Sequence, residues 1–317
     1  MIKSGPQIYR HLESSGVLRI GTYLWPHTVF APLEQLDPSR DLGELGARIV
    51  AHTQLDGWPV EVTAAGGLFT EPPPELHEIS DDDLDTKIAA EREVAQAFNL
   101  FICELALCGQ ATEPASPAVI GVARADGNHI MLMGGGGRHQ HRQMEMTTSL
   151  LGNGGISWMS GADNDRHLET VLRCARAPQL ATISPTLPQL VAGAYWMHDI
   201  RAPSEALLDA FIVVEQLVNH WWQGHRAGAT GARRDRLNDN RTSSVAVRIE
   251  VLQTDGYIDD DLADLLQQAR KLRNDLAHGA RISYTAALTG INAMTAALSS
   301  YLQEDLVAPV SGDGISW

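Results

Sequence analysis

Apolar side chains recur at helical spacing through five consecutive segments of the C-terminal part of the chain, and this pattern constrains the fold most. The segments are residues 188–199, 204–223, 241–253, 260–278 and 283–303. In the fourth segment, one helix face is formed by Leu262, Leu265, Leu266, Ala269, Leu272 and Leu276. Five amphipathic helices joined by short connections predict a helical bundle over residues 185–305.

The first 180 residues have a different texture. Stretches rich in β-branched and aromatic residues predict strands, a long helix is expected between them, and a further helix is expected near residues 164–176. The expected strands are 17–25, 58–63, 117–124 and 129–134, and the long helix is 81–107. These features predict an α+β domain over residues 1–180, with a sensing or regulatory role.

Two segments outside these domains complete the expected layout. The proline-containing stretch 178–188 lacks periodicity and is typical of a linker. Residues 306–317 are expected to form a flexible tail. We expect a mainly α fold, in which a C-terminal bundle of about five helices follows an N-terminal α+β domain.

Composition narrows the classes of protein to consider. The 317-residue chain has no run of 18 apolar residues, and its N-terminus lacks the apolar stretch of a signal peptide. Its three cysteines form no CxxC pair, which favours reduced thiols over a disulfide framework or a zinc site. We therefore expect a cytoplasmic protein with no membrane contact.

The net charge of −15 restricts where nucleic acid could bind. Phosphate groups are bound by Lys and Arg, so most of this surface would repel them. Residues 226–241 are the exception, because they hold five arginines against two aspartates. We expect this segment to be a loop whose Arg233, Arg234 and Arg236 contact RNA, although solubility charges would give the same composition.

The stretch KLRNDLAHGAR, residues 271–281, ends the fourth predicted helix. Asn274 and His278 are spaced i, i+4 and share a helix face, which Arg270 extends by one turn. Gly279 is placed to adopt the left-handed conformation that ends a helix. A histidine suits proton transfer near neutral pH, and an arginine can grip a phosphate with two parallel hydrogen bonds.

An ordinary structural explanation accounts for the same residues. The negative end of the helix dipole favours Lys, Arg and His in the last turn, and a C-terminal glycine is common. By spacing alone, an arginine five residues before a histidine is a weak signal of catalysis.

The stretch from Arg273 to Gly279 resembles the signature of HEPN domains, in which Arg precedes His by several residues and a polar residue often follows the Arg. The preceding helices are similar to the HEPN subset of ApeA-type anti-phage proteins, through Tyr195-Trp196 and through the segment from Phe211 to Leu217 that contains Glu215. The resemblance covers residues 185–305.

This resemblance implies a homodimeric, metal-independent endoribonuclease without a cofactor, acting as a toxin or anti-phage defence effector. The RNA 2′-hydroxyl would attack the adjacent phosphorus, which leaves a 2′,3′-cyclic phosphate and a 5′-hydroxyl. An antitoxin or another defence component is a possible partner. By this resemblance the catalytic residues are Arg273 and His278, and the supporting polar residue is Asn274. From their positions in the sequence we also expect Asp275 and Glu215 to be supporting residues and Arg270 to contact RNA.

Glu215 lies on an apolar stripe, where an unpaired carboxylate would be costly. We expect it to pair with Arg248 or Arg273, and in the second case it would also orient the arginine.

Two other hypotheses belong to different classes. The HEPN-like bundle could be a non-catalytic dimer that serves as an interaction scaffold, or the N-terminal domain could bind a regulatory ligand at its glycine-rich loop, residues 133–137. That loop lacks the Gly-Lys-Ser/Thr of a P-loop. The aspartates at 81–83 and 259–261 are interpreted as helix N-termini, so no metal site is expected.

Overall fold

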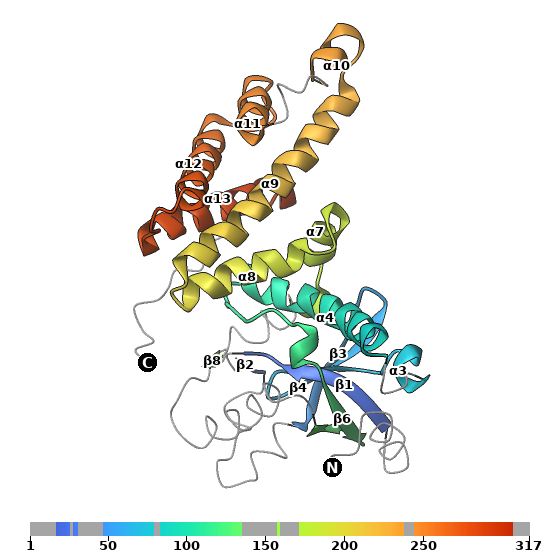
Figure 1. Ribbon diagram of the computed structural model, residues 1–317. Coiled ribbons are helices and arrows are strands. Elements are labelled where there is room, and N and C mark those ends of the chain that lie inside the picture. Colours follow the sequence, from blue (N-terminus) through green and yellow to red (C-terminus); the bar gives the residue numbers. More distant parts are fainter. Residues whose placement is uncertain are drawn as a thin grey trace. The chain divides into compact units, whose positions relative to one another are not determined.

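The computed structural model describes residues 17–25, 28–30, 47–78, 83–134, 157–158, 171–237 and 244–306. The chain divides into two compact units. The first holds the strands and most of helix α4 (Leu84–Leu107). The second begins at Arg176, holds the later helices and also includes Leu105–Ala111 (Figure 1).

The first unit is built on a six-stranded sheet in the order β3-β4-β5-β1-β6-β7, and every pairing in it is antiparallel. The strands are β1 (Val17–Tyr23), β3 (Ile49–Leu55), β4 (Trp58–Thr63), β5 (Gly67–Thr70), β6 (Gly121–Asp126) and β7 (His129–Gly134). Strands β2 (Thr28–Val29) and β8 (Ser157–Trp158) form a separate parallel pair. The short helix α3 (Pro74–Glu78) follows β5.

A large aromatic side chain at the centre of the sheet requires small neighbours. Phe69 is fully buried, and its ring meets the ring of Tyr23 edge-on at 5.6 Å between centroids. A Cβ at Gly21 would lie 2.1 Å from the carbonyl oxygen of Leu68, and one at Gly67 would lie 2.3 Å from the Phe69 ring. Glycine at both positions lets β1 and β5 pair while the ring is packed between them.

The expected mainly α fold is wrong, because the described N-terminal part contains this six-stranded antiparallel sheet beside the helices; the protein is α+β. Strands β1, β4 and β7 and helix α4 lie where they were expected. The strand expected at 117–124 is a 3₁₀ turn, η2 (Pro117–Val119), followed by β6. Gly127-Asn128 form the hairpin turn between β6 and β7, with Asp126 paired to His129.

The second unit is a bundle of α7 (Ala177–Ile183), α8 (Leu187–Asp199), α9 (Pro203–Gly228), α10 (Gly231–Leu237), α11 (Val245–Thr254), α12 (Asp260–Ala277) and α13 (Tyr284–Leu302). Helix α9 contacts α7, α8, α11, α12 and α13, and it packs most extensively against α8 and α13. At Gly290 of α13, an added Cβ would lie 2.6 Å from Leu207 of α9, so the missing side chain lets the two helices approach closely.

The five helices expected from the apolar periodicity correspond to α8, α9, α11, α12 and α13. Two other expectations are wrong, because the proposed linker before α8 contains α7 and the arginine-rich segment after α9 contains α10. Residues 135–137 of the glycine-rich loop lie outside the described residues, as does the expected tail beyond Leu306. Of the helix expected at 164–176, only residues from 171 onward are described.

Candidate active site at the C-terminal end of helix α12

The end of α12 is closed by its own backbone. His278 is the C-cap residue, and the N–H of Ala280 donates to the carbonyl of Asp275 at 2.9 Å. The N–H of Gly279 donates to the carbonyl of Leu276 at 2.9 Å, and Gly279 has φ +86°. These are the two bonds of a Schellman motif, so the glycine adopts the expected left-handed conformation.

Arg273 is anchored by the neighbouring helix α9. Its guanidinium carbon lies 5.6 Å from the ring centroid of Phe211, which is only 4% exposed. Its Nη1 donates to Oδ1 of Asn274 at 3.4 Å. The arginine is therefore half-buried by a cation–π contact, and Asn274 is the predicted supporting residue that contacts it.

His278 is exposed and lies in the connection between α12 and α13. Arg273 and His278 are five positions apart, which in a helix corresponds to about 7.5 Å along the axis and about 140° around it. The far end of the connection is fixed by Tyr284, whose ring stacks on buried His198 of α8 at 4.3 Å. His278 is thus open to solvent in a connection whose first end is held by the Schellman hydrogen bonds and whose second end is held by the contact between Tyr284 and His198.

The expected ion pair of Glu215 is absent among the described residues. Arg248 instead hydrogen-bonds Asn219 and lies over the ring of Trp222 at 5.8 Å, while Arg273 lies over Phe211. Glu215 is half-buried on α9, so part of its carboxylate stays hydrated without a cationic partner. Asp275 is exposed, and its backbone carbonyl supports the helix end.

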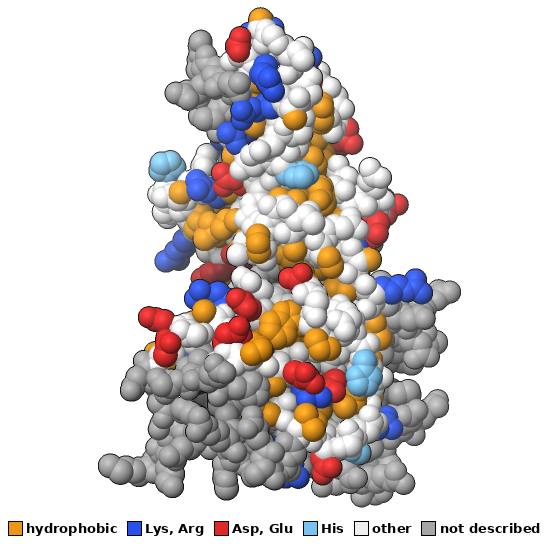
Figure 2. Space-filling view, turned by 90° about the vertical axis from the view of Figure 1, so that its right-hand side faces the viewer, with side chains coloured by type: hydrophobic (Ala, Val, Ile, Leu, Met, Phe, Trp, Pro, Cys, Tyr) orange, Lys and Arg blue, Asp and Glu red, His pale blue; other side chains and the backbone are white. Residues whose placement is uncertain are grey.

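The predicted RNA-binding arginines fall into two groups. Nε of Arg270 donates to Oε1 of Gln267 at 2.8 Å, and Gln267 in turn donates to the Ala246 carbonyl of α11. Nη2 of Arg233 donates to Asp255 at 2.8 Å. Arg234 and Arg236 are exposed and have no hydrogen bond or ion pair within the described residues. Blue side chains gather at the top of Figure 2, at the height of α10 in Figure 1.

Two carboxylates near the start of α9 are electrostatically disfavoured. Burial raises the pKa of Asp209, and the carboxylate of Glu205, four residues earlier, raises this pKa further. Burial also raises the pKa of Asp199 at the end of α8, although neighbouring His198 opposes this shift. Asp209 lies two residues before Phe211, the residue whose ring contacts the guanidinium of Arg273.

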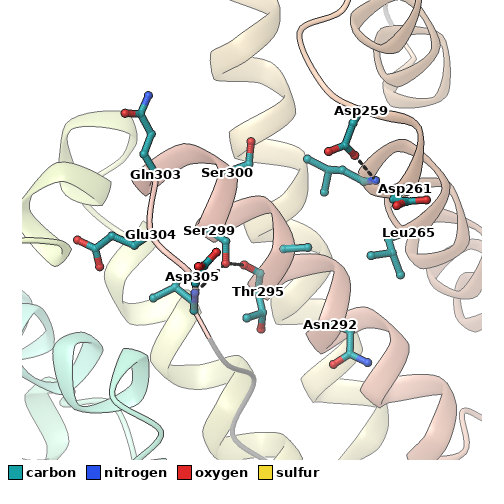
Figure 3. A pocket seen from close by; sticks show the side chains of 13 residues that line it. Asp259, Asp261, Leu265, Asn292, Thr295, Ser299, Ser300, Gln303, Glu304 and Asp305 are labelled. Carbon is teal, nitrogen blue, oxygen red and sulfur yellow. Dashed lines mark hydrogen bonds between the residues drawn. The ribbon is translucent and has the colours of Figure 1, made fainter.

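A cavity of about 680 Å³ opens at the other end of α12 (Figure 3). Its lining comes from the first turn of α12 and the last turns of α13, and it includes Asp259, Asp261, Glu304 and Asp305. The 18 residues of α12 separate this cavity from His278 by about 27 Å. In the described part of the chain, no group of three or more His, Cys, Asp or Glu side chains could hold a metal ion.

Sequence reasoning missed a second cluster of ionisable residues, at the end of α9. His225, Asp255 and Arg233 meet there, although they come from α9, from the connection after α11 and from α10. Their separation in sequence gives no spacing by which a motif could be recognised.

Within the described residues, every helix is too short or too polar to cross a lipid bilayer.

Comparisons with known proteins assign this chain to no family. No protein-family model, no curated protein and no solved structure matches this chain.

Proposed function

We propose that the chain is a HEPN-type, metal-independent endoribonuclease whose catalytic residues are Arg273 and His278. The observation that carries the proposal is that a half-buried arginine, held by a ring of the bundle core, and an exposed histidine both lie at one helix end. Arg273 is held by Phe211 and Asn274, while His278 is open to solvent. A phosphate-binding group benefits from a fixed position, and a proton-transfer group must reach its substrate.

In the proposed reaction, the 2′-oxygen forms a bond to phosphorus and the bond from phosphorus to the 5′-oxygen breaks. The 2′-hydroxyl proton passes to a neutral imidazole, and an imidazolium protonates the leaving 5′-oxygen. Two copies of His278, one from each subunit of a homodimer, supply these two states. The guanidinium of Arg273 stabilises the charge that develops on the non-bridging phosphoryl oxygens.

The test is incubation of RNA with the full chain in the presence of EDTA. We expect cleavage by the wild type and a loss of at least about a hundredfold in rate for His278→Ala, since general acid–base catalysis contributes this much. Mass spectrometry of the products should show 2′,3′-cyclic phosphate ends. Lys271→Ala is the matched control, because this exposed cation lies on the same helix.

Cleavage that requires magnesium, or that survives in His278→Ala at the wild-type rate, would refute the mechanism. Toxin or anti-phage activity would follow from such cleavage inside a cell. Growth arrest on expression of the wild type, but not of His278→Ala, tests that extension.

A non-catalytic interaction scaffold is the second candidate. It is favoured by the contact between Arg273 and Phe211, because a guanidinium that covers a buried ring already stabilises the bundle. It predicts a stable dimer by light scattering and no RNA turnover under any condition.

A further inference from the structure

Asp255 contacts two basic residues, His225 and Arg233, at the far end of the bundle from His278. Its Oδ2 lies 2.9 Å from Nε2 of His225 and 2.8 Å from Nη2 of Arg233. The Arg233 contact is a hydrogen bond, whereas Nε2 of His225 lies within contact distance of the carboxylate without forming a hydrogen bond to it. One carboxylate thus connects α10 to α9.

The backbone around Asp255 is held by hydrogen bonds at the end of α11. Asp255 caps α11, and the N–H of Tyr257 donates to the carbonyl of Leu252 at 2.8 Å, while Gly256 has φ +74°. This is a second Schellman end. The rings of Tyr257 and Trp222 lie 4.7 and 5.9 Å from that of His225, which is 4% exposed.

Helix α10 depends on such external contacts. It has seven residues, too few for a helix to be stable alone in water. Its apolar anchor is Leu237, 8% exposed, and its ionic anchor is Arg233. Arg233 is therefore already occupied, whereas Arg234 and Arg236 extend from the same helix into solvent.

We infer that Asp255 is a positioning residue for RNA binding: it tethers α10 through Arg233, so that Arg234 and Arg236 can contact phosphates. The inference rests on the proposed RNA substrate and assigns Arg233 a different role from its two neighbours. An acidic residue thereby strengthens the binding of an anion, because the order it gives to two arginines outweighs its own repulsion.

Asp255→Asn is the decisive variant, and Asp235→Asn is its matched control. Both remove one negative charge from or beside α10, but exposed Asp235 has no ion pair among the described residues. Binding of a fluorescent single-stranded oligoribonucleotide is measured by anisotropy in the His278→Ala background, which prevents cleavage. We expect Asp255→Asn to weaken binding about three- to tenfold, and Asp235→Asn to tighten it slightly.

Salt dependence separates the tether from the phosphate contacts. Arg234→Ala and Arg236→Ala should each reduce the slope of log affinity against log salt by about 0.7, the value for one contact to a single strand. Arg233→Ala should weaken binding as Asp255→Asn does, and the double variant should be no weaker than either alone. Asp255→Asn should have no effect once Arg234 and Arg236 are both alanine.

Hydrogen exchange without RNA provides a readout that does not depend on function. Amides 231–237 should exchange faster in both Asp255→Asn and Arg233→Ala, while the exchange of α9 and α13 stays unchanged. Arg233 is exposed, so its variant keeps the test open if Asp255→Asn fails to fold.

Tighter RNA binding by Asp255→Asn, or unchanged exchange in α10, would overturn the inference. A wild type that binds no RNA overturns it too, whatever the exchange result. A wild type that binds RNA without cleaving it, while Asp255→Asn weakens that binding as expected, would refute the proposed nuclease alone, so the two failures are distinguishable.

Discussion

The contact between Arg273 and Phe211 couples the candidate site to the bundle core, and its strength is measurable. Phe211→Leu keeps an apolar side chain but removes the ring face, so we expect it to lower the free energy of unfolding by about 1 kcal/mol. In a double-mutant cycle with Arg273→Ala, a coupling energy of about 0.5–1 kcal/mol is expected by urea denaturation. Phe211→Leu with Lys271→Ala should be additive; equal coupling in both pairs would contradict the contact.

The buried stack of His198 and Tyr284 should make stability depend on pH. Burial lowers the pKa of His198 from its ordinary 6.5, partly opposed by Asp199, so the folded protein binds the proton less tightly than the unfolded chain. This stability is fully present above about pH 6.5 and is lost as the pH falls from there toward the folded-state pKa. His198→Phe preserves the ring and removes the titration.

The measurement is urea denaturation from about pH 7.5 to pH 5.5, a range in which ordinary histidines titrate. Wild type should lose more stability over this range than His198→Phe. His220→Phe is the control, because it makes the same substitution at an exposed position; the change in slope caused by His198→Phe is compared with the change that it causes. Equal slopes for wild type and His198→Phe would show that His198 does not cause the loss.

Local features of the candidate site were predictable from the sequence, whereas partners across helices were not. Asn274 beside Arg273 and the left-handed Gly279 follow from spacing within one helix. The choice of Phe211 as partner of Arg273, and of Asp255 as partner of Arg233, depends on how α9, α10, α11 and α12 pack. The expected ion pair of Glu215 failed for this reason, because the stripe on which it lies does not specify which arginine the fold places opposite.

At the scale of single elements, the end of α12 determines how His278 is displayed. A Cβ at Gly279 would meet no atom within 4 Å, so Gly279→Ala tests backbone strain alone. With φ +86°, alanine should cost about 1–2 kcal/mol of unfolding free energy. Gly224→Ala, inside α9 and equally uncrowded, should instead stabilise by up to about 1 kcal/mol.

If thermal and urea denaturation show that Gly279→Ala lowers the unfolding free energy and Gly224→Ala raises it, the left-handed backbone at Gly279 disfavours any side chain. Destabilisation by both would show that crowding, not conformation, governs these positions. Gly279→Ala should also slow RNA cleavage, because it disturbs the turn that carries the exposed histidine.

The elements that the sequence predicted share a strong periodic signal, and the missed ones lack it. Helices α8, α9, α12 and α13 have long apolar faces. Helix α7 begins with Ala177-Pro178, and proline in the first turn starts a helix as readily as it marks a linker. Strand β5 has four buried residues, and β3 is mostly half-buried or exposed; neither alternates enough to be recognised.

At the scale of the whole molecule, the error in fold class came from non-local pairing. The β1–β5 and β1–β6 contacts join strands that lie far apart in the sequence, with α4 between β5 and β6. Helices form from contacts within one segment, so the bundle was visible in the sequence. A sheet assembled from distant strands is not, and its share of the fold was underestimated.

The proposed dimer leads to a prediction about mixed subunits. If one His278 accepts a proton and its copy donates one, a dimer with a single His278→Ala chain is inactive. Equal amounts of wild type and variant, denatured and refolded together, should then give about a quarter of the cleavage of an all-wild-type sample, since only that share of dimers is fully wild type. Independent sites would give about half. Mixing with Lys271→Ala should leave the rate unchanged, and a rate near one half with His278→Ala would refute the shared site.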